Sequence, residues 1–163
     1  ADVVSRKLSF SSCSSGDENV DLEKMINDFK TNVNMFDAMK IGKISTKSGY
    51  HNRALKYYWM AYRTTNNSSV GDKLTILQPL YKMAKIINKN KLVHHNELMI
   101  NALALIIIYK PTSPKNIYKL QQFGQSYKDA ELKATRISKV EIEKEINRCI
   151  DVVDIDRSKV YMY

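Results

Sequence analysis

Glycine and proline are scarce in this sequence, which has five glycines and three prolines among 163 residues. Sandwiches and barrels of short strands need a turn about every ten residues, and glycine and proline form most of those turns. Their scarcity therefore favours long helices joined by short polar loops. The contents of hydrophobic residues, 44%, and of charged residues, 26%, are those of a globular chain.

We predict a mostly α-helical protein with a flexible, Ser-rich arm at residues 1–16. A single compact helical domain follows at residues 17–163, which is long enough for about five to seven helices. At most one short pair of strands is expected.

Cysteines and long apolar runs are also scarce. Cys13 and Cys149 lie far apart and form neither a C-x-x-C motif nor a disulfide framework, which favours a reducing compartment, the cytoplasm or the nucleus. Residues 1–10 contain no apolar segment of signal-peptide length, so we do not expect secretion. The longest apolar stretch, residues 98–109, is twelve residues long and contains Asn101, which makes it too short for a transmembrane helix. A peripheral contact with a membrane surface is compatible with these features.

Catalytic and metal-binding motifs are missing as well. The one cluster of metal-type ligands is His94, His95 and Glu97, and adjacent histidines point about 100° apart on a helix, so no zinc site is expected. Neither glycine-rich phosphate loops nor the G-x-S-x-G motif of hydrolases occur. Cys149 lies on an apolar helical face, where a thiol is buried and inert. We therefore predict no enzymatic activity, no cofactor, no metal and no small-molecule substrate.

Acidic residues are almost absent from the middle of the chain. Residues 40–128 contain fifteen lysines and arginines but only two acidic residues, Asp72 and Glu97, for a formal charge of +13. Residues 1–39 have four basic and seven acidic residues, and residues 129–163 have seven and eight. Such segregation creates a persistent positive potential, whose natural partners are polyanions. Lysines outnumber arginines by twenty to six, which predicts nonspecific charge attraction. The abundance of Lys, Asn and Ile indicates an AT-rich coding sequence, which is common in viruses and in some protozoa.

The spacing of apolar residues predicts the first two helices. One helix begins near Asp21, is capped by Asp17 or Asp21, and has a single apolar stripe of Leu22, Met25, Ile26, Phe29, Val33 and Phe36. A flexible polar stretch between Gly42 and Gly49 ends it. The second helix, residues 51–63, has an apolar face of Leu55, Tyr58, Trp59 and Tyr62, and a cationic face of Arg53, Lys56 and Arg63.

Four more helices are predicted. A helix from Asp72 carries Lys82, Lys85 and Lys89 on one face, and Pro79 is expected to kink or interrupt it. Asn96 caps an apolar helix, residues 97–109, at the centre of the fold, with a short strand at residues 106–109 as the alternative. Helices at residues 113–123 and 138–153 complete the set, and the last begins with a capping box of Ser138 and Glu141.

The candidate polyanion-binding residues are nine cations of the middle region and one aromatic residue. Tyr57 lies next to Lys56 and outside the apolar stripe, where its ring is placed to stack on an unpaired base. The alternative interpretation is that Tyr57 is partly buried beside the stripe. The full set is Lys40, Lys43, Lys47, Arg53, Lys56, Tyr57, Arg63, Lys82, Lys85 and Lys89.

These features predict a non-enzymatic basic protein that binds nucleic acid, RNA in the first place, without sequence specificity. Its role would be assembly or packaging, as in a viral structural protein. Two alternatives fit the charge equally well. One is a matrix-type protein that binds anionic lipid headgroups and self-associates as a homo-oligomer, and the other is an adaptor for an acidic protein. The sequence contains no RNA-recognition motif that would separate the three.

Overall fold

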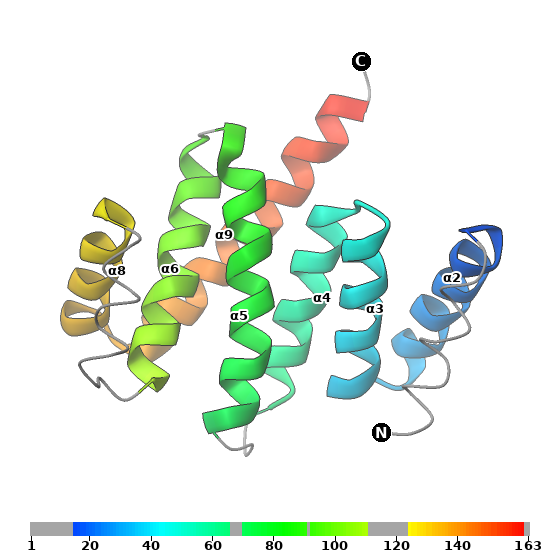
Figure 1. The fold of residues 1–163 in the computed structure, drawn as a ribbon, viewed down its shortest axis with the longest axis horizontal. Coiled ribbons are helices and arrows are strands. Elements are labelled where there is room, and N and C mark those ends of the chain that lie inside the picture. Colours follow the sequence, from blue (N-terminus) through cyan, green and yellow to red (C-terminus); the bar gives the residue numbers. More distant parts are fainter. Residues whose placement is uncertain (1–14, 66–69, 91, 111–123, 162–163) are drawn as a thin grey trace. The chain divides into compact units, whose positions relative to one another are not determined.

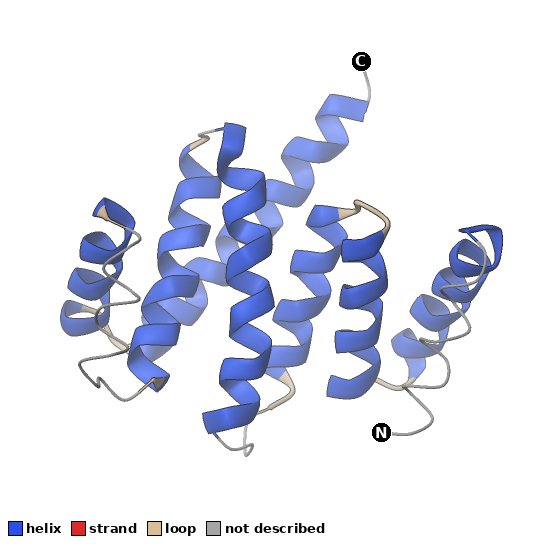
Figure 2. Cartoon of the chain, viewed as in Figure 1, coloured by secondary structure: helices blue, strands red, loops and turns tan. Residues whose placement is uncertain are grey.

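The computed structural model describes residues 15–65, 70–90, 92–110 and 124–161, and helices account for most of them (Figure 1, Figure 2). No strand occurs in these four segments, so the prediction of a mostly α-helical protein is confirmed. In chain order the elements are α2 (Ser15–Thr31), α3 (Met35–Lys47), α4 (His51–Arg63), α5 (Val70–Ile87), the 3-10 helix η1 (Asn88–Asn90), α6 (Val93–Tyr109), α8 (Gln125–Arg136) and α9 (Lys139–Tyr161).

The chain divides into two compact units. Residues 1–67 contain α2, α3 and α4, and residues 68–163 contain the other described helices. The single domain at residues 17–163 stays a prediction. Within the described segments, no helix combines the length and the hydrophobicity that crossing a bilayer requires.

α2 begins earlier than the sequence pattern indicates. Residues 1–14 of the predicted arm lie outside the described residues, but Ser15 and Gly16 belong to α2. Asp17 and Asp21 therefore lie inside the helix, and the prediction that one of them caps it is wrong.

The first predicted helix is in fact two helices, because residues 32–34 are not helical and α3 begins anew from its N-cap, Asn34. This residue has an extended backbone, with φ −147° and ψ 157°, and its side-chain oxygen accepts a hydrogen bond from the Asp37 N–H at 2.9 Å. The Asn34 amide donates in turn to the Asp37 carboxylate at 2.8 Å, which closes a reciprocal cap. Val33 and Phe36 consequently do not continue the buried stripe of α2, and both are exposed.

The predicted flexible stretch after Gly42 is helical. α3 runs through Gly42, so residues 43–47 form its last turns. Gly42 allows α3 to pack closely on α4, because a Cβ atom there would lie 2.6 Å from the Tyr58 ring. The Tyr58 hydroxyl and the Thr46 hydroxyl of α3 share a hydrogen bond of 3.0 Å. Gly49 follows α3 with φ +80°, a conformation that side chains with a Cβ rarely adopt.

α6 is the centre of the second unit and packs against α5, α8 and α9. Its residues 98–106 are buried on every side of the helix, which confirms the prediction of a buried central helix. The alternative strand at residues 106–109 is not formed, because the helix continues to the end of that segment.

The start of α6 differs from the prediction. The helix begins at Val93, so Asn96 lies inside it and does not cap it. His94 and His95 are residues of its first turn. The Nδ1 atom of His95 lies 3.0 Å from the carbonyl oxygen of Ile87, and this contact fixes the start of α6 to the end of α5.

The other helices of this unit agree with the prediction in part. Pro79 lies inside α5 without interrupting it. The helix predicted at residues 113–123 lies outside the described residues. α8 has no counterpart among the predicted helices, and its buried residues are Tyr127 and Ala130. α9 begins at its predicted cap, where the hydroxyl of Ser138 accepts the N–H of Glu141 at 3.2 Å.

Candidate nucleic-acid interface

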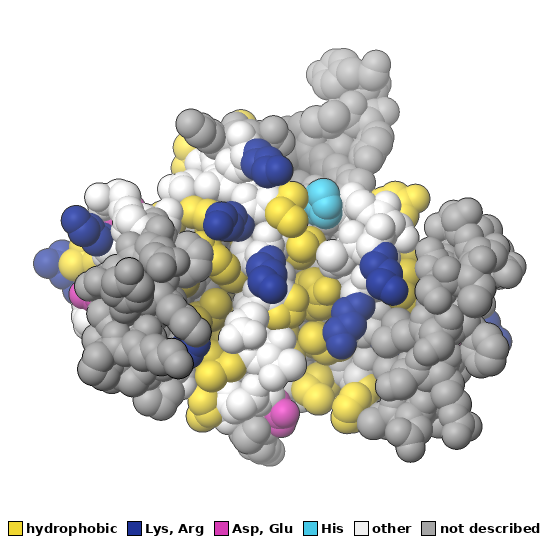
Figure 3. Space-filling model, viewed as in Figure 1, with side chains coloured by type: hydrophobic (Ala, Val, Ile, Leu, Met, Phe, Trp, Pro, Cys, Tyr) yellow, Lys and Arg dark blue, Asp and Glu magenta, His cyan; other side chains and the backbone are white. Residues whose placement is uncertain are grey.

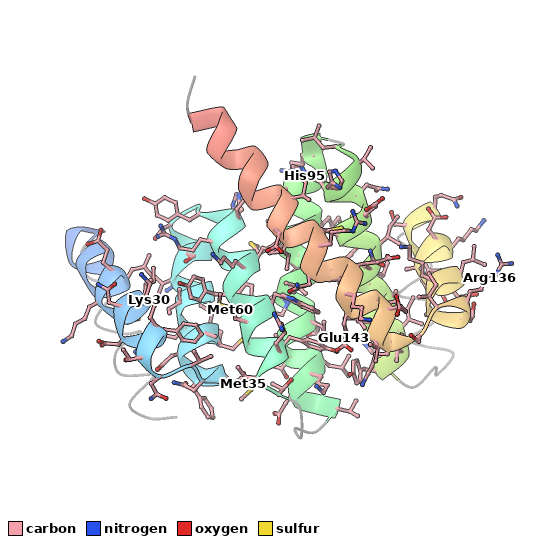
Figure 4. All side chains as sticks on the ribbon, turned by 180° about the vertical axis from the view of Figure 1, so that it is seen from behind. Lys30, Met35, Met60, His95, Arg136 and Glu143 are labelled. Atoms are coloured by element: carbon pink, nitrogen blue, oxygen red, sulfur yellow. The ribbon has the colours of Figure 1, made fainter. Side chains whose placement is uncertain are left out.

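All the exposed residues of α4 are cations. Seven of its thirteen residues are buried, three are exposed, and His51, Asn52 and Met60 are half-buried. Figure 4, which views the chain from behind, labels Met60 on α4. No acidic residue occurs in α4. The exposed cations, here called the α4 stripe, are Arg53, Lys56 and Arg63.

The α4 stripe faces away from α3. Tyr58 marks the side of α4 that packs on α3, because its ring lies against Gly42 and its hydroxyl bonds to Thr46. At 100° per residue, the stripe residues lie roughly 140° to 220° around the helix from Tyr58. The predicted apolar face is buried, and Ala54, Tyr57 and Ala61 widen it.

α3 exposes two of its three predicted lysines. Lys43 and Lys47 are exposed one turn apart, whereas Lys40 is only 4% exposed. A buried ammonium group cannot meet a phosphate at the surface, so we remove Lys40 from the interface. Phe36 lies within about 40° of Lys43 and Lys47 around the helix and is 59% exposed. The side of α3 defined by Phe36, Lys43 and Lys47 is called the α3 face below.

Tyr57 is buried beside the apolar stripe, as its alternative interpretation predicts, and is not placed to stack on a base. Its ring packs edge-on against Phe29 of α2, with centroids 5.5 Å apart and planes inclined by 64°. Burial raises the pKa of the Tyr57 hydroxyl above its usual value, although the nearby charge of Arg53 opposes the rise. A base cannot reach this ring, and Tyr57 is therefore also removed from the candidate interface.

Tyr50 is the exposed aromatic residue beside the α4 stripe. It is 37% exposed, and the Arg53 guanidinium lies over its ring, 5.0 Å from the centroid. The sequence patterns miss Tyr50 because it follows Gly49, outside the apolar and cationic stripes of the helix. Its spacing of three residues from Arg53 is the signal that identifies it.

The second unit carries its own line of cations on α5 and η1. Lys82, Lys85 and Lys89 are exposed as the sequence spacing predicts, and they are called the α5 stripe. Figure 3 shows dark blue side chains along α5, with a magenta one near its beginning. The acidic residue of this helix is Asp72 in its first turn. Among the described residues, neither Lys82 nor Lys89 forms an ion pair.

Three other cations of the second unit are paired with carboxylates. Lys133 of α8 donates to Glu145 of α9 at 2.6 Å and to the buried Asn101 of α6 at 3.1 Å. Burial alone would raise the pKa of Glu145, but Lys133 holds it below its usual value. Two further ion pairs are Arg148 with Glu97 at 3.2 Å and Lys144 with Glu141 at 3.6 Å.

Among the residues that the structure describes, no three His, Cys, Asp or Glu side chains are grouped to hold a metal ion. Burial, together with the charge of Glu97, raises the pKa of the Cys149 thiol to about 11. This thiol is protonated at neutral pH and is a poor nucleophile.

Comparison of the chain with protein-family models, with curated proteins and with solved structures finds no match. Only the geometry and the charge of the chain therefore bear on its function.

Proposed function

We propose that this protein binds nucleic acid, RNA in the first place, without sequence specificity, and serves in assembly or packaging. The observation that carries the proposal is the composition of the α4 stripe. The exposed residues of α4 are all cations, its half-buried residues are His51, Asn52 and Met60, and residues 38–71 contain no acidic residue at all. Like charges three or four residues apart destabilise a helix by tenths of a kcal/mol per pair. A polyanion removes that repulsion.

Phosphate groups fit this surface better than a specific small ligand does. The cations lie along convex helix faces, and most are lysines, which attract a phosphate as point charges without fixing its orientation. Binding of this kind releases condensed counterions from the nucleic acid, so it weakens steeply as salt rises. The α3 face, the α4 stripe and the α5 stripe each contribute separately in this proposal.

The proposal is tested by measuring the affinity of the protein for single-stranded RNA over a salt series. With roughly five to eight phosphate contacts, log K falls against log salt with a slope of about −0.7 per contact. Changing Arg53, Lys56 and Arg63 together to Ala should weaken binding at least about tenfold and flatten the slope by about 2. The triple Lys82, Lys85 and Lys89 to Ala should act similarly.

The matched control is a triple in α9, Lys139, Lys144 and Arg148 to Ala. It removes the same formal charge, but acidic neighbours already neutralise that face: Glu97 pairs with Arg148, and Glu141 pairs with Lys144. The control should therefore reduce affinity much less. If it reduces affinity as much as the α4 triple does, total charge alone governs binding. Equal affinity at 50 and 300 mM salt would contradict the electrostatic proposal as a whole.

One observation favours a second candidate, the matrix-type protein. After the α5 stripe, Leu92 is 48% exposed and Val93 is 69% exposed. Two apolar side chains beside a line of lysines suit the interface of an anionic membrane, where each lysine contributes roughly 1 kcal/mol. Phosphatidylserine vesicles are therefore the second ligand in the salt series. Tight vesicle binding without RNA binding would favour the matrix-type protein, and binding to neither would favour the adaptor.

A further inference from the structure

The α3 face combines an exposed aromatic ring with two lysines. Phe36, Lys43 and Lys47 lie within about 40° of one another around α3, and the two lysines are about 6 Å apart along the helix axis. Among the described residues, neither lysine forms an ion pair. The one carboxylate of α3, Asp37, is engaged by the Asn34 amide in the helix cap.

Phe36 is too exposed to contribute much to folding. Its exposed fraction of 59% contrasts with 4% for Phe29, which packs in the core with Tyr57. An exposed phenylalanine has an energetic cost in water, and a solvated helix face has no packing need for one. Its position is nevertheless fixed, because the reciprocal cap of Asn34 and Asp37 holds the first turn of α3.

We propose that the α3 face is a binding site for single-stranded nucleic acid, in which Phe36 stacks on an unpaired base and Lys43 and Lys47 bind the adjacent phosphates. This inference deepens the proposed function and depends on it. Stacking of a base on an aromatic side chain is tolerant of sequence, because every base has a π-face. Paired bases in a duplex are stacked on one another and cannot present a face to Phe36. The site therefore gives the protein a preference for single strands that the lysines alone do not give.

The inference is tested by fluorescence anisotropy with two ligands, an unstructured 20-nucleotide oligo(U) and an RNA duplex of the same length. Phe36→Ala should weaken oligo(U) binding about tenfold, within the range measured for loss of one stacked base, and should change duplex binding less than twofold. Phe36→Tyr keeps an aromatic ring and should stay within twofold of the unchanged protein on both ligands.

Two variants serve as controls. Val93→Ala removes another strongly exposed apolar side chain, at a site without an aromatic ring, and should leave oligo(U) binding within twofold. The double variant Lys43→Ala and Lys47→Ala should bind both ligands more weakly, since both contain phosphates. Thermal unfolding followed by circular dichroism should give all variants a midpoint close to that of the unchanged protein, because none of these side chains is buried.

The outcomes separate this inference from the proposed function. If Phe36→Ala leaves oligo(U) binding within twofold while the lysine variant weakens it, the stacking site is wrong and nonspecific RNA binding stands. Equal losses on oligo(U) and on the duplex also overturn stacking. If the unchanged protein binds neither ligand at low salt, both proposals fail. As a second measurement, ultraviolet crosslinking of oligo(U) should join the RNA to the peptide that contains Phe36, and crosslinks confined to other peptides would contradict the site.

Discussion

α4 and α9 are both amphipathic helices with one apolar side, but they differ in whether carboxylates accompany their cations. Every exposed charge of α4 is positive, whereas Lys144 of α9 pairs with Glu141 of the same helix and Arg148 of α9 pairs with Glu97 of α6. Pairing of this kind is the usual state of a solvated helix and adds only tenths of a kcal/mol per pair. In α4, by contrast, no carboxylate of the same helix can pair with the cations, because the helix contains no acidic residue.

The two units also hold their helices together differently. α3 and α4 approach closely at a glycine and bury aromatic rings between helices. α6, α8 and α9 are joined instead by a polar node, in which Lys133 contacts both Asn101 and Glu145. The second arrangement therefore includes an ion pair in its helix packing, at the contact of Lys133 with Glu145.

The largest expected effect comes from reversing the α4 stripe. Changing Arg53, Lys56 and Arg63 to Glu replaces three attractions to phosphate with three repulsions. We expect RNA affinity to fall about a hundredfold, roughly the square of the effect of alanine. Filter binding at 50 mM salt measures it, and circular dichroism checks that the helix content is unchanged. A loss no greater than that of the alanine triple would mean that the stripe does not contact RNA.

Gly42→Ala tests the close packing of the first unit. The new methyl group would lie 2.6 Å from the Tyr58 ring, which is buried and bonded to Thr46, so α3 and α4 must separate. We expect the free energy of unfolding to fall by about 2 kcal/mol, as for other overpacked cores. Urea unfolding measures it.

Tyr58→Leu provides the control for that prediction. Because leucine removes the ring that the methyl group would meet, Gly42→Ala should cost less in a Tyr58→Leu background than alone. Additive effects of the two substitutions would show that the contact is not the cause.

Lys133→Met tests the polar node of the second unit and its dependence on pH. The Lys133 and Glu145 side chains are 27% and 34% exposed, so solvent screens the pair and we expect a cost of only about 1 kcal/mol at pH 7. Because the folded-state pKa of Glu145 is lowered, the pair stabilises the fold above the unfolded-state pKa. That contribution is lost as the pH falls below about 5. Urea unfolding of both proteins should therefore show a difference at pH 7 that shrinks toward pH 3, and a constant difference would contradict the ion pair.

Met60→Glu should give α4 an acidic residue among its cations, as α9 has. We expect its effect to be the smallest of the four substitutions predicted here. The new carboxylate would lie four residues after Lys56 and three before Arg63 and would pair with both. We expect it to raise the free energy of unfolding by about 0.5 kcal/mol relative to Met60→Gln. RNA affinity should fall about threefold, since two cations of the stripe become compensated. A gain in stability without loss of affinity would separate the stripe from RNA binding.

The sequence predicts α4 best because all the determinants of that helix are local. Its apolar and cationic residues alternate with helical spacing, Gly49 precedes it, and the observed bounds are those predicted. α6 is also predicted as a buried central helix, although its first turn begins at Val93 and not after Asn96. A cap is harder to place where the N-cap residue, Leu92, makes no side-chain hydrogen bond.

The errors occur where a distant contact or a competing local bond decides the structure. Val33 and Phe36 fit the apolar spacing of α2, but the Asn34 cap breaks the helix and turns Phe36 outward. Gly42 is read as a helix end, but it lies inside α3, where the Tyr58 ring of another helix leaves no room for a Cβ atom.

In the candidate interface, too, the features set by local spacing were predictable and those set by contacts between helices were not. The spacing of exposed cations on α4 and α5 was visible in the sequence, because a helix wheel places them. The burial of Lys40 and Tyr57 was not, because it depends on neighbouring helices such as α2, whose Phe29 covers Tyr57. α8 escaped prediction since its buried side, Tyr127 and Ala130, is too small to form an apolar stripe.

The single tryptophan of the chain gives the two units separate spectroscopic signals. Trp59 lies in α4, is buried, and stacks on Tyr62 with ring centroids 4.8 Å apart. Its fluorescence therefore reports on residues 1–67, while far-ultraviolet circular dichroism sums the helices of both units. Superimposable urea transitions from the two probes would mean that the units unfold as one cooperative domain. If the fluorescence transition occurs at a different urea concentration from the circular dichroism transition, residues 1–67 unfold independently. A rise in the midpoint of the fluorescence transition on adding RNA would then show that the nucleic acid binds to this unit.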